Sequence, residues 1–222
     1  MISEKGLCKA LKNAFKRGGY GVIPQTVEVR TAAGEYRRSD ILINGSAWAV
    51  SCLTTELPPE AAVQIVKDVG YLPVEAVKVQ KGEANQLMME GIAAERYDML
   101  QAQRGDMIPM KKIPVIFKGR WQLYQTMRGS VHAFDTELLQ LIDKDCEKAC
   151  SCFMSAVGHL GIFLLGDSTV YLAPGRFSAE DEEKVLHIAA LDWEQQIEHD
   201  DPAVNISLFD EDGDVPMEDA EG

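Results

Sequence analysis

Apolar residues recur every three or four positions over residues 3–17, which predicts an amphipathic helix at the start of the chain. Ser3 is a suitable N-cap for this helix, and Gly18-Gly19 ends it. Its apolar face consists of Leu7, Leu11, Ala14 and Phe15, and a second face consists of Lys5, Lys9, Lys12 and Lys16. These four lysines are candidate binding residues for phosphate or carboxylate groups, although the pattern favours a solvated face.

Three strand-like segments follow the helix, and their sequences are VIPQTVEVRT (22–31), EYRRSDILI (35–43) and SAWAVSCLT (46–54). Asn44-Gly45 lies between two apolar runs, which is a strong signal for a β-hairpin. Pro58-Pro59 then begins a second helix that reaches about Val69. A further short strand is expected over residues 74–80, so the predicted order is α-β-β-β-α-β.

The second half of the chain alternates hairpins with helices. The predicted elements are a helix over 83–103, a hairpin around Gly119-Arg120, a long helix over 136–156, a hairpin over 161–175 and a last helix over 177–198 with Ser178 as N-cap. We therefore expect a mixed α/β (α+β) fold. Its predicted parts are an α/β unit over 1–82, an α+β unit over 83–199, either separate from the first or sharing its core, and a tail over 200–222.

The charge of the chain is concentrated at one end. The 222 residues carry a formal net charge of −13, yet twelve Asp and Glu and no Lys or Arg follow Lys184. Without these twelve negative charges, residues 1–184 have a net charge of −1. This distribution predicts a disordered, solvated acidic tail and argues against a surface that mimics nucleic acid throughout.

The sequence is that expected of a cytoplasmic protein that does not enter a membrane. No apolar run approaches the length needed to span a bilayer, and lysines interrupt the N-terminal segment where a signal peptide is apolar. Five cysteines is an odd number, and three of them fall within CEKACSC (146–152). Reduced thiols fit this arrangement better than a disulfide framework.

The clustered cysteines could hold a metal, take part in redox chemistry or pack in the core. On the predicted helix over 136–156, Cys146 and Cys150 are four residues apart and lie in the apolar stripe, whereas Cys152 lies nearly opposite. Three thiolates placed in this way cannot converge on one zinc ion. We therefore predict that Cys146 and Cys150 are buried and reduced, and we expect no metal there.

The segment RRSDILINGSAWAVSC places Asp40 at the second predicted strand, and AAVQIVKDVGY places Gln64 on the following helix. With the α-β-β-β-α-β order, residues 4–80 resemble the restriction-endonuclease-like PD-(D/E)XK family. The resemblance implies a nuclease scaffold and a magnesium or manganese ion held by Asp40. The family's second acid and its lysine are replaced by Val50-Ser51-Cys52, which leaves such a metal with one carboxylate and favours a scaffold that has lost catalysis.

The acidic tail also contains a short apolar cluster. Ile206, Leu208 and Phe209 stand directly before DEDGD. Acid beside an apolar group is typical of a peptide that docks into an apolar pocket with a basic rim. FDEDGDVPM is similar to the acidic tip of bacterial single-stranded-DNA-binding proteins, although here EDAEG follows it. We predict that this tail, with Phe209 as a contact residue, binds the lysine face or a basic surface of a partner; the alternative is a free tail.

Three classes of function are compatible with these observations. The leading hypothesis is a non-enzymatic binding or adaptor protein without a cofactor; an unknown protein is its expected partner, and nucleic acid is left open. The alternative is a nuclease with a rearranged site around Asp40 that depends on magnesium or manganese. The second alternative is a metal or redox protein that uses Cys146, Cys150 and Cys152.

Overall fold

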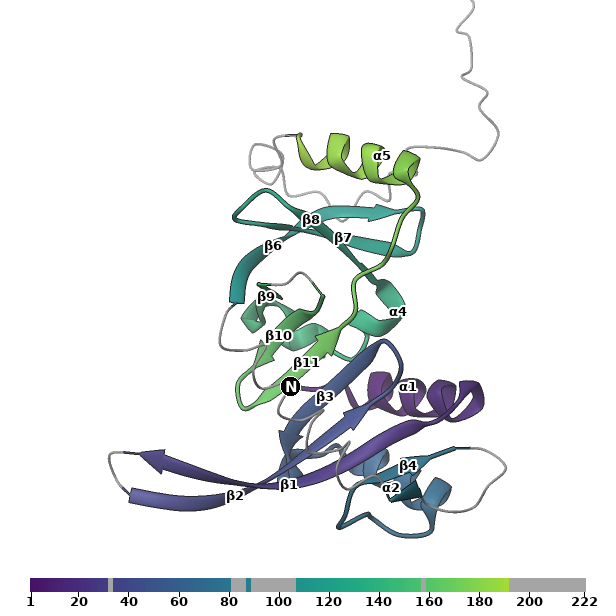
Figure 1. Ribbon diagram of the computed structural model, residues 1–222, viewed down its shortest axis with the longest axis vertical. Coiled ribbons are helices and arrows are strands. Elements are labelled where there is room, and N and C mark those ends of the chain that lie inside the picture. Colours follow the sequence, from purple (N-terminus) through teal and green to yellow (C-terminus); the bar gives the residue numbers. More distant parts are fainter. Residues whose placement is uncertain (32–33, 81–86, 89–106, 157–158, 192–222) are drawn as a thin grey trace, which may run out of the picture.

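Eleven antiparallel strands form one sheet in the computed structural model of this chain, which describes residues 1–31, 34–80, 87–88, 107–156 and 159–191. The strand order is β5-β4-β1-β2-β3-β11-β10-β9-β6-β7-β8. Helices cover parts of this sheet (Figure 1). The predicted mixed α+β class is therefore confirmed.

The first part of the chain contains α1 (Glu4–Arg17), β1 (Tyr20–Thr31), β2 (Gly34–Asn44), β3 (Trp48–Leu53), the 3-10 turn η1 (Thr54–Glu56), α2 (Pro59–Val69), β4 (Val77–Val79) and β5 (Leu87–Met88). The second part contains β6 (Met107–Phe117), β7 (Trp121–Thr126), β8 (Val131–Asp135), α4 (Thr136–Leu139), the 3-10 turn η2 (Lys144–Ala149), β9 (Ser151–Ser155), β10 (Gly161–Leu165), β11 (Ser168–Leu172) and α5 (Ala179–Ala189).

Local signals set the ends of α1 as the sequence predicts. The Ser3 hydroxyl accepts a hydrogen bond from the Gly6 N–H at 3.2 Å. Gly18 and Gly19 have φ of 142° and 96°, a region that favours glycine, and the helix ends there. Leu7 and Leu11 are buried, and the four predicted lysines are exposed. The predicted helix with one apolar and one lysine face is confirmed.

Three predicted hairpins are also confirmed. The Asn44-Gly45 turn joins β2 to β3, and the Gly45 N–H donates to the Trp48 carbonyl at 2.9 Å. Gly119, with φ of 62°, turns the chain between β6 and β7, and Gly166, with φ of 66°, turns it between β10 and β11. Gly119 and Gly166 each occupy a turn position with a positive φ, a region that favours glycine.

The helix predicted over 136–156 is wrong. The chain forms only the short α4, then η2, and then strand β9, which pairs with β10 on one side and β6 on the other. Cys152 and Met154 contact the main core cluster, whereas Phe153 packs in the cluster on the opposite face. A short apolar run fits both a helical and an alternating period, and pairing with two strands selects the second.

Other predicted elements fall partly or wholly outside the described residues. The predicted helix over 83–103 lies outside the described residues except at Leu87–Met88, and these two residues form strand β5. The tail over 200–222, with Phe209, lies outside as well. Ser178 caps α5 as expected, and its hydroxyl accepts from the Asp181 N–H at 3.3 Å. The predicted boundary between two units at residue 82 stays a prediction. Strand β3, from the first predicted unit, pairs with β11, from the second.

Buried side chains form three clusters around the sheet. The main cluster joins α1 and α2 to one sheet face through residues such as Leu7, Leu11, Ile41, Ile65, Phe134 and Phe163. A second cluster on the opposite face contains Ile23, Leu42, Ala49, Ile162 and Tyr171. Figure 1 shows α5 lying across β6, β7 and β8, where it forms the third cluster.

The first turn of α1 packs closely against the segment that follows α4. The Ser3 N–H donates to the Leu141 carbonyl at 2.8 Å, and a Cβ added at Gly6 would overlap the Gln140 carbonyl oxygen. We therefore predict that Gly6→Ala lowers the free energy of unfolding by about 1–3 kcal/mol, because α1 must move away from backbone atoms. Urea unfolding measures this effect. The exposed Lys12→Ala is the control, and an equal effect of both substitutions would contradict the prediction.

Candidate functional site

A groove with a volume of about 830 Å³ lies beside α1. Its walls come from α1, the start of β1, the β2–β3 turn, β4, the β6–β7 turn and the corner between β8 and α4. Six lining positions are the glycines Gly6, Gly18, Gly19, Gly21, Gly45 and Gly119. Space for a bound molecule next to the backbone is open at Gly18 and Gly119, where an added Cβ would meet no other atom. The volume lies in the range of ligand-binding pockets in proteins.

One side of α1 lines the groove, and only one of the four predicted lysines, Lys9, belongs to that lining. Gly6, Ala10, Asn13 and Arg17 recur at helical spacing and line the groove. Lys9, at the border of this stripe, lines it too. Lys5, Lys12 and Lys16 are exposed and lie outside the groove lining.

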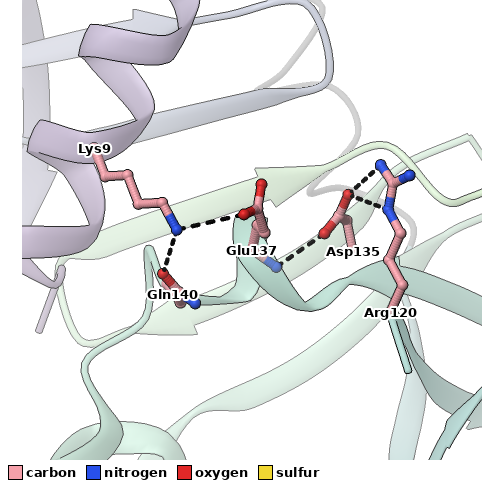
Figure 2. Close-up of polar contacts among 5 residues, drawn as sticks. All are labelled: Lys9, Arg120, Asp135, Glu137 and Gln140. Carbon is pink, nitrogen blue, oxygen red and sulfur yellow. Dashed lines mark hydrogen bonds and ion pairs between the residues drawn. The ribbon is translucent and has the colours of Figure 1, made fainter.

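Two cations at one end of the groove are paired with carboxylates (Figure 2). Lys9 Nζ lies 3.4 Å from Glu137 Oε1 and donates to Gln140 Oε1 at 3.3 Å. Arg120 Nε and Nη2 donate to Asp135 Oδ2 at 2.9 and 2.7 Å. Asp135 also caps α4, because its Oδ1 accepts from the Glu137 N–H at 2.9 Å. The positive charge at this end is largely neutralised.

The other end of the groove carries Arg17 and Lys78, which are exposed. Lys78 lies on β4 opposite Gly21 of β1, and Arg17 is the last residue of α1. Neither side chain forms an ion pair within the described part of the chain. This end of the groove is therefore positively charged, and Gly18, Gly19 and Gly21 also line it.

Asp40, the residue suggested by the nuclease resemblance, is almost fully buried, with 2% of its surface exposed. Arg38 contacts both of its carboxylate oxygens, with Nε 2.8 Å from Oδ1 and Nη2 2.9 Å from Oδ2. The register pairs Asp40 with Leu53 on β3. Because side chains alternate along a strand, Ser51 and Leu53 share the face of Asp40, and neither can supply an acid or a lysine there.

The other residues around the resemblance have structural partners. Gln64 donates to Asp68 Oδ1 at 2.9 Å, and the Tyr20 hydroxyl donates to Asp68 Oδ2 at 2.9 Å. Among the residues that the structure describes, no cluster of three or more His, Cys, Asp or Glu could hold a metal ion. A catalytic role of Asp40 belongs only to the nuclease alternative, which stays a hypothesis.

The Cys52 thiol faces away from Asp40 into the main core and is held in its neutral form. Burial, and then the nearby charges of Glu56 and Asp40, raise the pKa of Cys52 to about 12 from an ordinary value of 9.0. Burial likewise raises the pKa of Cys8. Neither thiol is expected to react readily as a thiolate at neutral pH.

This shift predicts a dependence of stability on alkaline pH. A raised folded-state pKa contributes stability that is complete below the unfolded value of 9.0 and is lost as the pH rises through about 12. We expect Cys52→Ala to remove this contribution, so that its stability falls less steeply over that interval, by at most about 1.4 kcal/mol per pH unit. Urea unfolding at a series of pH values measures both slopes, and equal slopes would contradict the prediction.

The predicted burial of Cys146 and Cys150 is wrong. Cys146, Cys150 and Cys152 are half-buried and pack at the edge of the main core cluster. The reason is local structure, because Cys146 lies on η2 and Cys150 directly precedes β9. Cys150 and Cys152 therefore lie on the same side of the chain, with their sulfur atoms 4.0 Å apart. The helical interpretation placed Cys152 on the opposite side and missed this pair.

No sequence motif marks the groove residues Arg120, Asp135 and Glu137, because the fold brings them to α1 from a distant segment. Together, the fold and the groove define an antiparallel α+β protein with a charged surface groove. No protein-family model matches the sequence, and no curated protein and no solved structure matches it significantly. None of the helices in the described ranges has both the length and the apolar character needed to cross a membrane.

Proposed function

We propose that this chain is a non-enzymatic binding protein whose groove beside α1 takes an acidic segment of a protein partner. The observation that carries the proposal is the pair of exposed cations, Arg17 and Lys78, at one end of the groove. Carboxylates of a partner would compensate their charge there. Complementary charge of this kind favours fast and specific association.

The shape of the groove favours an extended peptide. Its lining includes Gly18 and Gly119, where an added Cβ would meet no other atom, so a bound main chain has room to approach the backbone there. At the opposite end, Lys9 and Arg120 are held by partly exposed ion pairs, which cost little free energy to exchange for new ones. An acidic peptide could therefore extend from Arg17 towards Arg120.

The overall charge favours an acidic peptide over nucleic acid. Residues 1–184 have a net charge of only −1, since the chain carries −13 and twelve acidic residues follow Lys184. Proteins that bind nucleic acid usually present a broad basic surface that neutralises many phosphates. Two exposed cations in one groove suit a short acidic segment better.

Fluorescence anisotropy tests this proposal with a labelled peptide that has the sequence of residues 205–222, NISLFDEDGDVPMEDAEG, and with the chain shortened to residues 1–204, so that its own tail does not compete with the peptide. We expect saturable binding that weakens with salt, because screening shortens the range of the attraction to about 8 Å at physiological ionic strength. The double variant Arg17→Glu/Lys78→Glu should weaken binding about tenfold or more, an effect of at least about 1.4 kcal/mol.

The control variant is Lys12→Glu/Lys16→Glu, which changes the net charge equally but lies outside the groove lining. It should retain most of the affinity. Equal weakening by both double variants would indicate attraction by overall charge and contradict the groove proposal. Absence of saturable peptide binding would contradict it too, and preferential binding of a single-stranded oligonucleotide would favour a nucleic-acid partner instead.

The proposal also predicts catalytic silence. Ser51 and Leu53 share the strand face of Asp40, where a nuclease of the resembled family needs an acid and a lysine around a metal. We expect no cleavage of DNA or RNA with magnesium or manganese. Cleavage that persists through repeated purification and is lost in Asp40→Asn would contradict this and favour the nuclease alternative.

A further inference from the structure

Cys150 and Cys152 form a close pair of thiols at the junction of η2 and β9. Their Sγ atoms are 4.0 Å apart, and Cys152 Sγ lies 3.8 Å from the Cys150 carbonyl oxygen. All five cysteines of the chain fall within the described residues and are thiols. The pair is independent of the groove proposed as the binding site.

Extended backbone geometry explains why these two thiols meet. Side chains two residues apart in an extended chain point to the same side, and the intervening Ser151 is exposed. In a strand, the Cα atoms of two residues that are separated by one intervening residue lie about 6.6 Å apart. That separation lies at the upper end of the range for disulfides, which is about 4.4–6.8 Å. Cys150 precedes the first paired residue of β9, so its backbone can move closer without breaking strand pairing.

The other thiols are less suited to react. Cys8 and Cys52 have only 8% and 2% of their surface exposed, whereas Cys150 and Cys152 are half-buried. Burial also raises the pKa values of Cys8 and Cys52, which disfavours their reactive thiolate forms. Cys146 is half-buried too, on η2, and serves as the comparison residue for the pair.

We propose that Cys150 and Cys152 are a redox-active dithiol that exchanges with low-molecular-weight disulfides such as oxidised glutathione. The thiolate of one cysteine attacks a glutathione sulfur, forms a mixed disulfide and releases the first glutathione thiolate. The thiolate of the other cysteine then attacks the protein sulfur of that mixed disulfide and releases the second. The protein loses two electrons and two protons, and oxidised glutathione is reduced to two thiols.

The resulting disulfide is expected to be easily reversed. Closing a bond of about 2.05 Å from a strand-like spacing strains the backbone at Ser151. Strained and exposed disulfides are reduced more readily than structural ones. Reduced glutathione in excess should therefore restore both thiols.

The experiment incubates the full native chain with oxidised glutathione, quenches it with acid and determines the intact mass and the peptides that contain cysteine. We expect a loss of the mass of two hydrogen atoms, a cross-link between Cys150 and Cys152, and recovery with reduced glutathione. Cys146→Ser should behave as the wild type. Cys150→Ser and Cys152→Ser should each lose the cross-link and keep glutathione attached to the remaining thiol of the pair.

Three outcomes would overturn the proposal. All five thiols could stay reduced in oxidised glutathione, glutathione could remain attached to both cysteines of the native chain, or the cross-link could involve Cys146. Peptide mapping of the unsubstituted protein distinguishes these outcomes, so the test does not depend on the folding of any variant.

Discussion

Phe163→Ala is expected to lower the free energy of unfolding by about 3–5 kcal/mol, the range for truncating a phenylalanine in a packed core. Phe163 is fully buried and lies with Tyr124 and Phe134 in a cluster of edge-to-face rings. The ring centroids are 5.3 Å apart for Phe134 and Phe163 and 5.7 Å apart for Tyr124 and Phe163. Truncation therefore removes two aromatic contacts in addition to apolar burial.

The position of this aromatic cluster means that Phe163→Ala should destabilise the whole fold. Tyr124, Phe134 and Phe163 come from β7, β8 and β10 and pack in the same cluster as Leu7 and Leu11 of α1. Urea unfolding followed by circular dichroism measures the change. Leu186→Ala is the control, because Leu186 is 59% exposed and its truncation should cost little. A loss below about 1 kcal/mol for Phe163→Ala would contradict the described packing.

Arg38→Met is expected to destabilise the protein by about 3 kcal/mol, the cost of breaking a buried ion pair. The substitution removes a guanidinium that contacts both oxygens of Asp40, and the Asp40 side chain is only 3% exposed. The loss should approach this value because the almost fully buried Asp40 carboxylate would keep its charge without the guanidinium that compensates it.

A double-mutant cycle separates the pair from the individual residues. Replacing both members, as in Arg38→Met/Asp40→Leu, should cost less than Arg38→Met alone, because an apolar pair leaves no buried charge. Urea unfolding of the two single variants and the double variant provides the coupling free energy. Additive losses would show that the contact between Arg38 and Asp40 does not stabilise the fold.

The elements that the sequence predicts correctly are those that local chemistry specifies. Ser3 and Ser178 cap helices, Gly18-Gly19 ends α1, and Asn44-Gly45 turns a hairpin. These signals act over a few residues, through a single hydrogen bond or a backbone angle that favours glycine. The apolar and lysine faces of α1 follow from helical spacing alone and could be predicted for the same reason.

The candidate site could be predicted only in part. Lys9 is a candidate from the sequence because it belongs to a regular stripe on α1, but its neighbours in the groove come from distant segments. Glu137 and Gln140 reach Lys9 because the segment after α4 packs against the first turn of α1. Nothing in the sequence near Arg17 indicates that Lys78 lies at the same end of the groove.

The sequence by itself determined α1, the three hairpin turns and the cap of α5, because each depends on neighbours in the chain. Tertiary structure decided that residues 151–155 form a strand, since the period of a short apolar run is ambiguous and pairing with β10 and β6 resolves it. It thereby decided that Cys150 and Cys152 meet, and it also placed Arg38 against Asp40. These contacts depend on which strands pair and in which register, and that choice is made by burial of the whole sheet rather than by any local segment.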